Sequence, residues 1–290
     1  MDWQRAGLND NDLNWTFSFS RMRRAVLETF QEAIVSQPID AVVAYAVSPT
    51  VLRELTQRCP NIITFLINFD DIFHWPRPGS YTKNFYPVDC TSAVDLILTS
   101  NPDIVPRYLL YGGLAMFSPG AADPEIFRPF DAPFIYDVSF VGHAFAWRRW
   151  FIQHLRKEGV HVTTFGSGWE NGPLPWSDLP RVFSQSRINL GFSATGQSLL
   201  IRQIKTRDFE VPMSGGLYLT LNNPYIHRVY DVGKEILVFD DPADCARKIR
   251  WLLAHPDEAD KIRRAGHARA RRDHTYEARF ERAFSLAGLL

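Results

Sequence analysis

The sequence has few cysteines and no long apolar run. Its three cysteines, Cys59, Cys90 and Cys245, lie far apart in a chain of 290 residues. Their odd number and wide spacing argue against a disulfide framework and a zinc motif, and favour buried thiols in a reducing compartment. No apolar stretch is long enough to span a bilayer, and residues 1–20 are too polar for a signal peptide. These absences predict a cytoplasmic protein, with peripheral contact to a membrane left open.

A net charge is also lacking. The 32 lysines and arginines are balanced by 32 aspartates and glutamates, so no global electrostatic field favours nucleic acid. The arginine-rich run at 263–272 has acidic residues around it, which favours a solvated helix face over nucleic-acid binding. The hydrophobic share of 46% and the charged share of 22% are typical of a folded globular protein. The length suits one large or two medium domains.

Apolar strands and amphipathic helices alternate in the first half. A helix is predicted over residues 21–36, where apolar residues recur on one face, and another begins at Ser48 and Pro49. The predicted strands span residues 41–47, 61–67, 95–99 and 114–117. Because the run at 41–47 is continuously apolar, we expect that strand to be buried on both faces. The alternation predicts a parallel sheet covered by helices.

A long loop, residues 68–87, follows the second predicted strand and carries Asp70, Asp71 and His74. In an open parallel sheet, ligands bind beyond the carboxyl ends of the strands. These three side chains are therefore candidate catalytic groups, as a general base for a substrate hydroxyl or as a group that orients it. The alternative is a turn within a solvated loop, because aspartates at strand ends are common turn formers.

A stretch rich in proline, alanine and aspartate, residues 118–133, lacks any helix or strand period and divides the chain. We predict an N-terminal domain over 1–122, a linker over 123–134, a C-terminal domain over 135–274, and a last helix over 275–290 that packs back on the first domain. The predicted strands of the second half span 137–141, 160–165, 188–192, 217–219 and 235–239. The predicted helices span 146–157, 179–184, 224–230, 241–253, 257–271 and 275–287.

The segment 202–220 combines cations with a carboxylate. We interpret its first part as a helix that delivers Arg202, Lys205 and Arg207 to a pocket. Such cations suit a phosphate, and Glu210 suits a sugar diol because a carboxylate accepts two hydroxyl hydrogen bonds. Together these residues predict a pocket for a nucleoside diphosphate-sugar. The alternative is a surface helix whose charges are solvated and which leads into a core strand.

Two glycine-bearing turns are further candidates. Gly215 and Gly216 would let the backbone approach a ligand. The turn at Gly142 and His143 lacks the full dinucleotide-binding spacing, but it can place backbone N–H groups near a diphosphate with help from Arg148 or Arg149. A plain tight turn is the alternative there. The loop at 166–169 is either part of a base pocket or only a loop, and we favour the loop. No cluster has metal-ligand spacing.

From residue 118 to 284 the chain resembles glycosyltransferases of the GT-B fold, in particular the CgeB-like subgroup and the group 1 C-terminal domains. The resemblance is carried by PGAADPEIFRP at 119–129, DVSFVG at 137–142, KTRDFEVPMSGGLYLT at 205–220 and a long C-terminal signature at 231–276. It implies an α/β protein with two Rossmann-like domains facing across a cleft, the N-terminal one being short.

The resemblance also implies roles for single residues. In the wider group a Glu-x7-Glu motif precedes a small-residue turn, and its second glutamate binds the ribose. Glu210 matches that second glutamate, whereas Arg202 stands at the position of the first, which departs from the pattern. Lys205 and Arg207 become candidates for contacts with the diphosphate.

The expected activity is that of a hexosyltransferase-type enzyme, which transfers a sugar from a nucleoside diphosphate-sugar to an acceptor hydroxyl. No metal or other cofactor is expected, because fixed cations can stabilise the leaving diphosphate. The Glu210 pattern favours retention of the anomeric configuration, since inversion needs a base from the first domain. The acceptor, whether saccharide, lipid-linked glycan, protein or small molecule, stays open. The alternatives are a catalytically silent nucleotide-sugar binder and, ranked lower, a non-hydrolysing epimerase.

Overall fold

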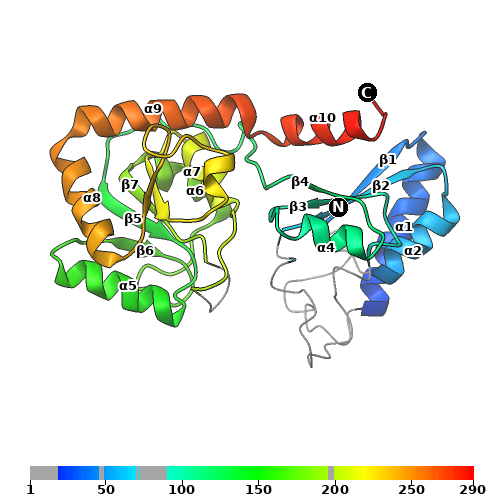
Figure 1. The fold of residues 1–290 in the computed structure, drawn as a ribbon, viewed down its shortest axis with the longest axis horizontal. Coiled ribbons are helices and arrows are strands. Elements are labelled where there is room, and N and C mark those ends of the chain that lie inside the picture. Colours follow the sequence, from blue (N-terminus) through cyan, green and yellow to red (C-terminus); the bar gives the residue numbers. More distant parts are fainter. Residues whose placement is uncertain (1–18, 46–48, 70, 72–89, 195–198) are drawn as a thin grey trace. The chain divides into compact units, whose positions relative to one another are not determined.

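The structure is a computed structural model, and it describes residues 19–45, 49–69, 71, 90–194 and 199–290. The chain divides into two compact units, each with a parallel sheet and helices (Figure 1). The first unit holds the chain up to Thr99 together with Asp103–Met116, and the second holds Ser100–Pro102 together with Phe117–Leu290. The predicted domain borders and the predicted packing of the last helix on the first domain stay predictions.

The first unit is built on a sheet in the order β1-β2-β3-β4. Its strands are β1 (Ala41–Tyr45), β2 (Ile63–Asn68), β3 (Leu96–Thr99) and β4 (Ala115–Phe117), and its helices include α1 (Phe19–Ser36), α2 (Pro49–Arg58) and α4 (Val105–Leu110). β1 pairs with β2, and β2 with β3, in parallel. The prediction of a parallel sheet that alternates with helices is confirmed for these elements.

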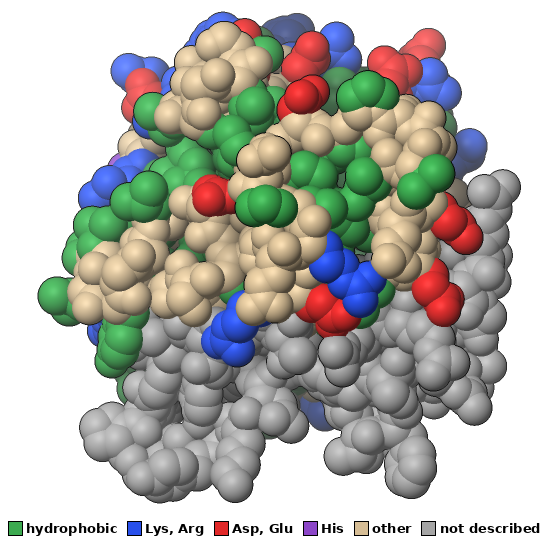
Figure 2. Space-filling view, turned by 90° about the vertical axis from the view of Figure 1, so that its right-hand side faces the viewer, with side chains coloured by type: hydrophobic (Ala, Val, Ile, Leu, Met, Phe, Trp, Pro, Cys, Tyr) green, Lys and Arg blue, Asp and Glu red, His purple; other side chains and the backbone are tan. Residues whose placement is uncertain are grey.

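β1 is half exposed, so the prediction of a strand buried on both faces was wrong. Only Ala44 of its five residues is buried, whereas Val43 and Tyr45 are exposed. β1 stands first in the sheet order and pairs with β2 alone among the described strands. Figure 2 views the molecule from the side on which β1 lies in Figure 1, and apolar side chains gather on the described part of that face. An apolar run therefore does not distinguish an edge strand from a central one.

The second unit is built on a sheet in the order β6-β5-β7-β8-β9. Its strands are β5 (Tyr136–Val141), β6 (Thr163–Phe165), β7 (Ser186–Gly191), β8 (Tyr218–Leu221) and β9 (Leu237–Phe239). All four neighbouring pairs are parallel. The chain moves from β5 to one side of the sheet for β6, and then returns to the other side for β7. The strand order thus reverses between β5 and β7, which is where open parallel sheets bind their ligands.

Helices cover both faces of this sheet (Figure 1). The second unit contains α5 (Ala146–Lys157), α6 (Leu179–Ser184), α7 (Arg207–Met213), α8 (Pro242–Ala254), α9 (Pro256–Asp273) and α10 (Tyr276–Leu286), with short 3-10 helices at Trp176–Asp178 and Ile226–Arg228. No helix in the described part of the chain is long and apolar enough to cross a membrane.

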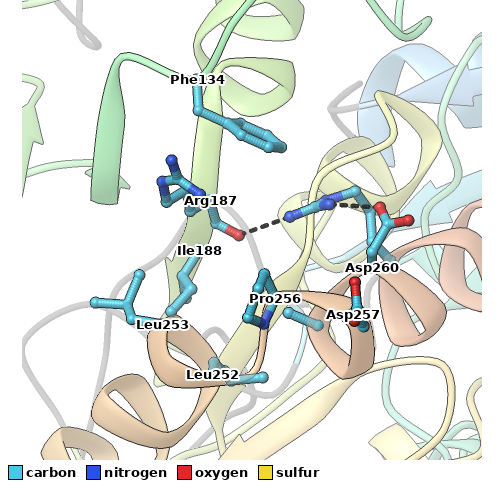
Figure 3. Close-up of a pocket in the computed structure, with 10 residues that line it drawn as sticks. Phe134, Arg187, Ile188, Leu252, Leu253, Pro256, Asp257 and Asp260 are labelled. Carbon is cyan, nitrogen blue, oxygen red and sulfur yellow. Dashed lines mark hydrogen bonds and ion pairs between the residues drawn. The ribbon is translucent and has the colours of Figure 1, made fainter.

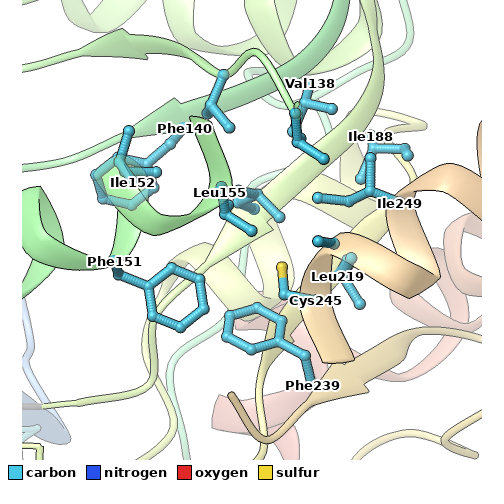
Figure 4. Packing of buried hydrophobic residues seen from close by; sticks show 14 of the residues in the cluster. Val138, Phe140, Phe151, Ile152, Leu155, Ile188, Leu219, Phe239, Cys245 and Ile249 are labelled. Atoms are coloured by element: carbon cyan, nitrogen blue, oxygen red, sulfur yellow. The ribbon is translucent and has the colours of Figure 1, made fainter. Parts of the chain in front are cut away.

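Two apolar cores, one on each face, hold the layers together. On one face α5 and α8 pack on the sheet through residues such as Phe151, Leu155 and Ile249 (Figure 4). On the other face α6 and α7 contribute the second core. β8 serves both, because Leu219 belongs to the first core and its neighbour Tyr218 to the second. This alternation is the period of two that a strand buried between two helical layers requires.

Several predicted elements of this unit are confirmed to the residue. α5 and α6 begin and end as predicted, at 146–157 and 179–184. α8 has the predicted cap, since the Asp241 side chain accepts a hydrogen bond from the backbone N–H of Asp244. These elements depend on local signals, namely apolar spacing, a capping residue and a proline in the first turn.

Two predicted helices differ from the structure. The helix expected over 224–230 is only the short 3-10 helix Ile226–Arg228, entered through a turn in which Asn223 accepts the N–H of Tyr225. The helix expected to carry Arg202 and Lys205 begins only at Arg207. The backbone before it is extended, because the N–H of Gln203 bonds to Ser193 and residue 202 bridges to residue 194. Pairing with a distant segment therefore replaced the expected helical turn.

His274 lies at the break between α9 and α10 and is buried. Its Nε2 lies 2.8 Å from the Val229 carbonyl and its Nδ1 2.8 Å from a guanidinium nitrogen of Arg279. Nε2–H therefore donates and Nδ1 accepts, which assigns a neutral ring. Burial, followed by the charge of Arg279, lowers the pKa of His274 to about 4. Arg269 also lowers it, whereas the Val229 carbonyl and Asp273 raise it.

We expect His274→Gln to remove part of the acid sensitivity of the protein. Above pH 6.5 the ring is neutral whether the chain is folded or unfolded. Its protonation therefore takes nothing from the unfolding free energy at those pH values. As the pH falls towards 4, His274 becomes protonated in the unfolded chain but stays neutral in the folded chain. This difference lowers the unfolding free energy by up to about 3 kcal/mol. Urea unfolding of variant and wild type between pH 7 and 4.5 measures the difference.

The exposed His227 offers the matched control as His227→Gln. The control should keep the wild-type dependence on pH, whereas His274→Gln should flatten it. A wild-type slope in His274→Gln would contradict the assignment of the neutral buried ring.

Candidate functional site

The candidate site lies where the strand order reverses. β5 ends at Val141 and is followed by Gly142 and His143, and β7 ends at Gly191 and is followed by residues 192–194. Both loops leave the carboxyl edge of the same parallel sheet. The segment 199–206 pairs with residues 193 and 194, so it lies at this edge as well.

The Gly142 loop is held by the loop that follows β6. The Gly142 N–H donates to the Phe165 carbonyl at 2.9 Å, and the Trp169 indole N–H donates to the Gly142 carbonyl at 2.8 Å. Gly166 has φ of 122°, and a Cβ there would overlap the Gly142 carbonyl. Only glycine therefore allows the two backbones to come this close. The loop at 166–169 thus supports the site, although we had expected only a loop.

A pocket opens at the N-terminus of α5. Its volume is about 400 Å³, and it is lined by His143, Ala144, Phe145, Ala146, Arg149, Ser167 and Gly168. α5 has no side-chain cap, and its N-cap residue Phe145 and first residue Ala146 line this opening. A helix N-terminus with free N–H groups attracts anions. Arg149 links α5 to the loop after β6 at this pocket, since its Nη1 donates a hydrogen bond to the Gly168 carbonyl at 3.3 Å.

Arg148 brings a positive charge that no carboxylate neutralises among the described residues. Its guanidinium lies within 6 Å of the ring centroids of four aromatic side chains, which are Phe140, Phe145, Trp147 and Phe192. Nη1 donates to the His143 carbonyl at 3.1 Å, whereas the buried Nε has no acceptor. Burial lowers the pKa of Arg148 to about 10, with Tyr218 acting in the opposite direction and the charge of Arg207 in the same one. A buried cation in this state favours an anionic ligand.

Asp208 fixes α7 against the sheet. It accepts hydrogen bonds from the Tyr218 hydroxyl at 2.7 Å and from the backbone N–H of Lys205 at 2.8 Å. Burial raises its pKa to about 6. The Tyr218 ring crosses β7 at Gly191, where a Cβ would overlap the hydroxyl. A side chain on β7 at this point would therefore break the link between β8 and α7.

Arg207 and Glu210 form an ion pair on α7. Glu210 is 4% exposed, and Arg207 lies over the Phe183 ring, 5.0 Å from its centroid. Burial raises the pKa of Glu210, and the charge of Arg207 acts in the opposite direction. The ion pair holds Arg207 and Glu210 together, and the charge of Arg207 also acts on Arg148.

The remaining predicted binding residues have neighbours of their own. Arg202 donates to the Asn222 carbonyl at 2.8 Å, just beyond β8. Lys205 lies in the extended segment before α7. A Cβ on Gly216 would lie 2.7 Å from the Asn189 amide nitrogen, and Gly215 has φ of 72° and faces Pro129. Both glycines are therefore needed for packing, and their predicted approach to a ligand stays a prediction.

The three catalytic candidates lie in the first unit. Asp70 and His74 are outside the described residues. Asp71 is 0% exposed, and the Tyr108 hydroxyl donates to its Oδ2 at 3.1 Å. Burial and the neighbouring Asp71 charge raise the pKa of Tyr108, so the tyrosine stays a donor to that carboxylate. A catalytic role for any of the three stays a prediction.

Two site residues, Asp208 and Tyr218, escaped the sequence-based reasoning, whereas the loop at 166–169 was weighed as part of a base pocket but not favoured. The two partners of the Tyr218–Asp208 hydrogen bond are ten positions apart, and no local pattern joins them. Gly166 had a signal, because it belongs to a glycine-rich loop directly after a predicted strand.

A second pocket lies at the opposite edge of the sheet, near the start of β7 (Figure 3). Its volume is about 240 Å³, and Arg187, Asp260 and Arg263 line it with apolar residues of α8 and α9. Arg263 has a carboxylate partner there, although its buried Nε, like that of Arg148, has no acceptor among the described residues. Arg263 donates to the Arg187 carbonyl at 3.1 Å and to Asp260 at 2.8 Å.

Residues 148–285 match a family model described as "Glycosyl transferase-like". The matched segment begins at Arg148 and includes Arg207 and Glu210, so it covers most of the candidate site. No curated protein matches the chain. The CgeB-like subgroup expected from the sequence stays a prediction.

Solved glycosyltransferase structures share the fold. Sucrose-phosphate synthase from Thermosynechococcus elongatus has a TM-score of 0.66 and 11% identity, over 94% of this chain and 79% of that one. Anabaena HepE in complex with UDP has a TM-score of 0.64 and 11% identity, over 92% and 82%. The pneumococcal O-GlcNAc transferase GtfA, with UDP and GlcNAc, has a TM-score of 0.58 and 14% identity, over 91% and 60%. The predicted fold class is thereby confirmed, as an α/β protein with parallel sheets like those of GT-B glycosyltransferases.

Gly166→Ala should damage the candidate site. The new Cβ would overlap the Gly142 carbonyl and require a positive φ, so we expect a loss of about 3 kcal/mol or more in unfolding free energy. Gly172→Ala in the same loop is the control, because φ is 67° there and nothing lies within 4 Å of the new Cβ. It should cost only about 1–2 kcal/mol. Equal losses in urea unfolding would refute the close approach of the two loops.

Proposed function

We propose that the protein transfers a hexose from a nucleoside diphosphate-sugar to an acceptor hydroxyl, without a metal and with retention of the anomeric configuration. The observation that carries this proposal is Arg148, a partly buried cation without a carboxylate partner in the described structure, in the first turn of α5, whose N-terminus has no side-chain cap. A diphosphate would satisfy both features. The glycosyl transferase-like match over residues 148–285 supports the same reaction class.

UDP-sugars are the first donors to test. HepE and GtfA were both solved with UDP, HepE also with UDP-glucose. At 11–14% identity these structures support only the fold. The choice of uracil as the nucleobase is therefore a proposal for this chain. We propose that Glu210 binds the ribose and that Arg148 and Arg207, with Lys205, bind the diphosphate. Fixed cations there would stabilise the charge that grows on the leaving diphosphate.

Retention agrees with the position of Asp71. An inverting enzyme needs a base that reaches the acceptor hydroxyl. Asp71 is enclosed and bonded to Tyr108, so it would have to move before it could act. A retaining reaction places no such demand on this residue.

A catalytically silent nucleotide-sugar binder is the second candidate. The observation in its favour is Arg202, which stands where the resemblance expects a glutamate and is bonded to the Asn222 carbonyl. Turnover distinguishes the two. Slow hydrolysis of the donor, or transfer to any acceptor, supports the enzyme, whereas tight binding without either supports the binder.

A thermal-shift panel of UDP, GDP, TDP, CDP and ADP tests the proposed ligand. A nucleotide at about 100 times its Kd should stabilise the folded chain by about 2.7 kcal/mol, which raises Tm by roughly 5 °C. Nucleoside monophosphates should raise Tm less, because they lack the second phosphate. No shift with any diphosphate would refute the proposed site.

Glu210→Ala should weaken binding of the nucleotide by about 1–3 kcal/mol, through loss of hydrogen bonds to a charged group. Isothermal titration measures this loss. Glu258→Ala is the control, since Glu258 is exposed and pairs with the exposed Lys261 near the start of α9. Unchanged affinity in Glu210→Ala would contradict the ribose role.

A further inference from the structure

Glu210 is not free to bind a ribose in the conformation seen here. Its carboxylate receives a side-chain hydrogen bond from Thr206 and the ion pair from Arg207, and the side chain is only 5% exposed. A ribose diol would donate two hydrogen bonds to this carboxylate, and with only 5% of the side chain exposed it cannot reach the oxygens until a covering group moves.

Arg207 is the partner that can leave. Its side chain is 25% exposed, and it is long and unbranched. It lies across the Phe183 ring, where a guanidinium can slide while it keeps its aromatic contact. Thr206, the residue just before α7, has a short side chain whose hydroxyl can move only by rotation about χ1 and covers less of the carboxylate than the guanidinium does.

Arg148 explains why Arg207 would leave Glu210 when a diphosphate binds. The charges of Arg148 and Arg207 repel, and the described residues supply no carboxylate to Arg148. A diphosphate beside Arg148 would remove this repulsion and attract Arg207. Arg207 would then exchange one anion, Glu210, for another, the diphosphate, at little net electrostatic cost.

We propose that Arg207 covers Glu210 in the free protein and moves onto the diphosphate when a nucleotide binds, which exposes Glu210 to the ribose. The proposal rests on the proposed function, since it concerns the same site. It makes Arg207 a specificity-determining residue: the site accepts nucleoside diphosphates and discriminates against free nucleosides, which carry no charge to draw Arg207 away.

The test compares UDP with uridine, or the corresponding pair for whichever base binds, on wild type and Arg207→Ala. In the variant we expect UDP affinity to fall about tenfold or more, because a charge-assisted contact is lost. Uridine affinity should rise roughly threefold to tenfold, because no ion pair has to be broken. Isothermal titration measures UDP, and ligand-detected NMR measures uridine.

The opposite signs separate this inference from general damage, which would weaken both ligands. A uridine affinity that falls or stays unchanged in Arg207→Ala overturns the inference, while UDP binding to wild type leaves the proposed function standing. If no nucleoside diphosphate binds the wild type, the proposed function itself fails, and the inference with it.

Arg181→Ala is the matched control. This exposed arginine on α6 also lies over an aromatic ring, that of Phe130 at 5.2 Å, and has no contact with Glu210. Both affinities should keep their wild-type values in it. If Arg207→Ala fails to fold, Arg207→Gln removes the same charge with less change in volume, and its two affinities must shift in the same opposite directions.

Discussion

The hydrogen bond from Tyr218 to Asp208 decides where the candidate site can form. It joins the central strand β8 to α7 and is fully buried, so breaking it would leave two polar groups without partners. It exists only because β7 has no side chain at Gly191. Asp208 stands between Arg207 and Glu210 in the sequence, so fixing one residue places both neighbours at the carboxyl edge of the sheet.

The chemistry of the site follows from charges that are only partly compensated. Arg148 is surrounded by aromatic rings and has no carboxylate partner among the described residues, whereas Arg207 shares Glu210 with Thr206. The pocket near the start of β7 shows the contrast, since Arg263 there is paired with Asp260 and a carbonyl. The proposed anion site depends on this difference, since the described residues give Arg263 a carboxylate partner and give Arg148 none.

The same short helix also reaches the last part of the chain. Phe209, which follows Asp208, packs against the rings of Tyr230 and His274. The Pro212 carbonyl lies 3.0 Å from Nδ1 of His267 on α9. α7 is therefore held from both sides, by β8 through Asp208 and by α9 and its junction with α10 through Phe209. Movement at the site is left to side chains such as Arg207 rather than to the helix.

Local patterns in the sequence were enough for the alternation of strands and helices, the bounds of α5 and α6, the cap of α8 and the candidate residues Arg148, Arg207 and Glu210. These features depend on neighbours within one or two turns. The sequence alone could not predict that residues 202 and 203 pair with residues 193–194, that β1 is an edge strand, or that Tyr218 bonds Asp208. Each depends on a partner brought close only by folding, such as the backbone at 193–194. The residue types were determined by the sequence, and their meeting at one sheet edge was decided by the tertiary structure, because strand order and close backbone approach are properties of the whole sheet.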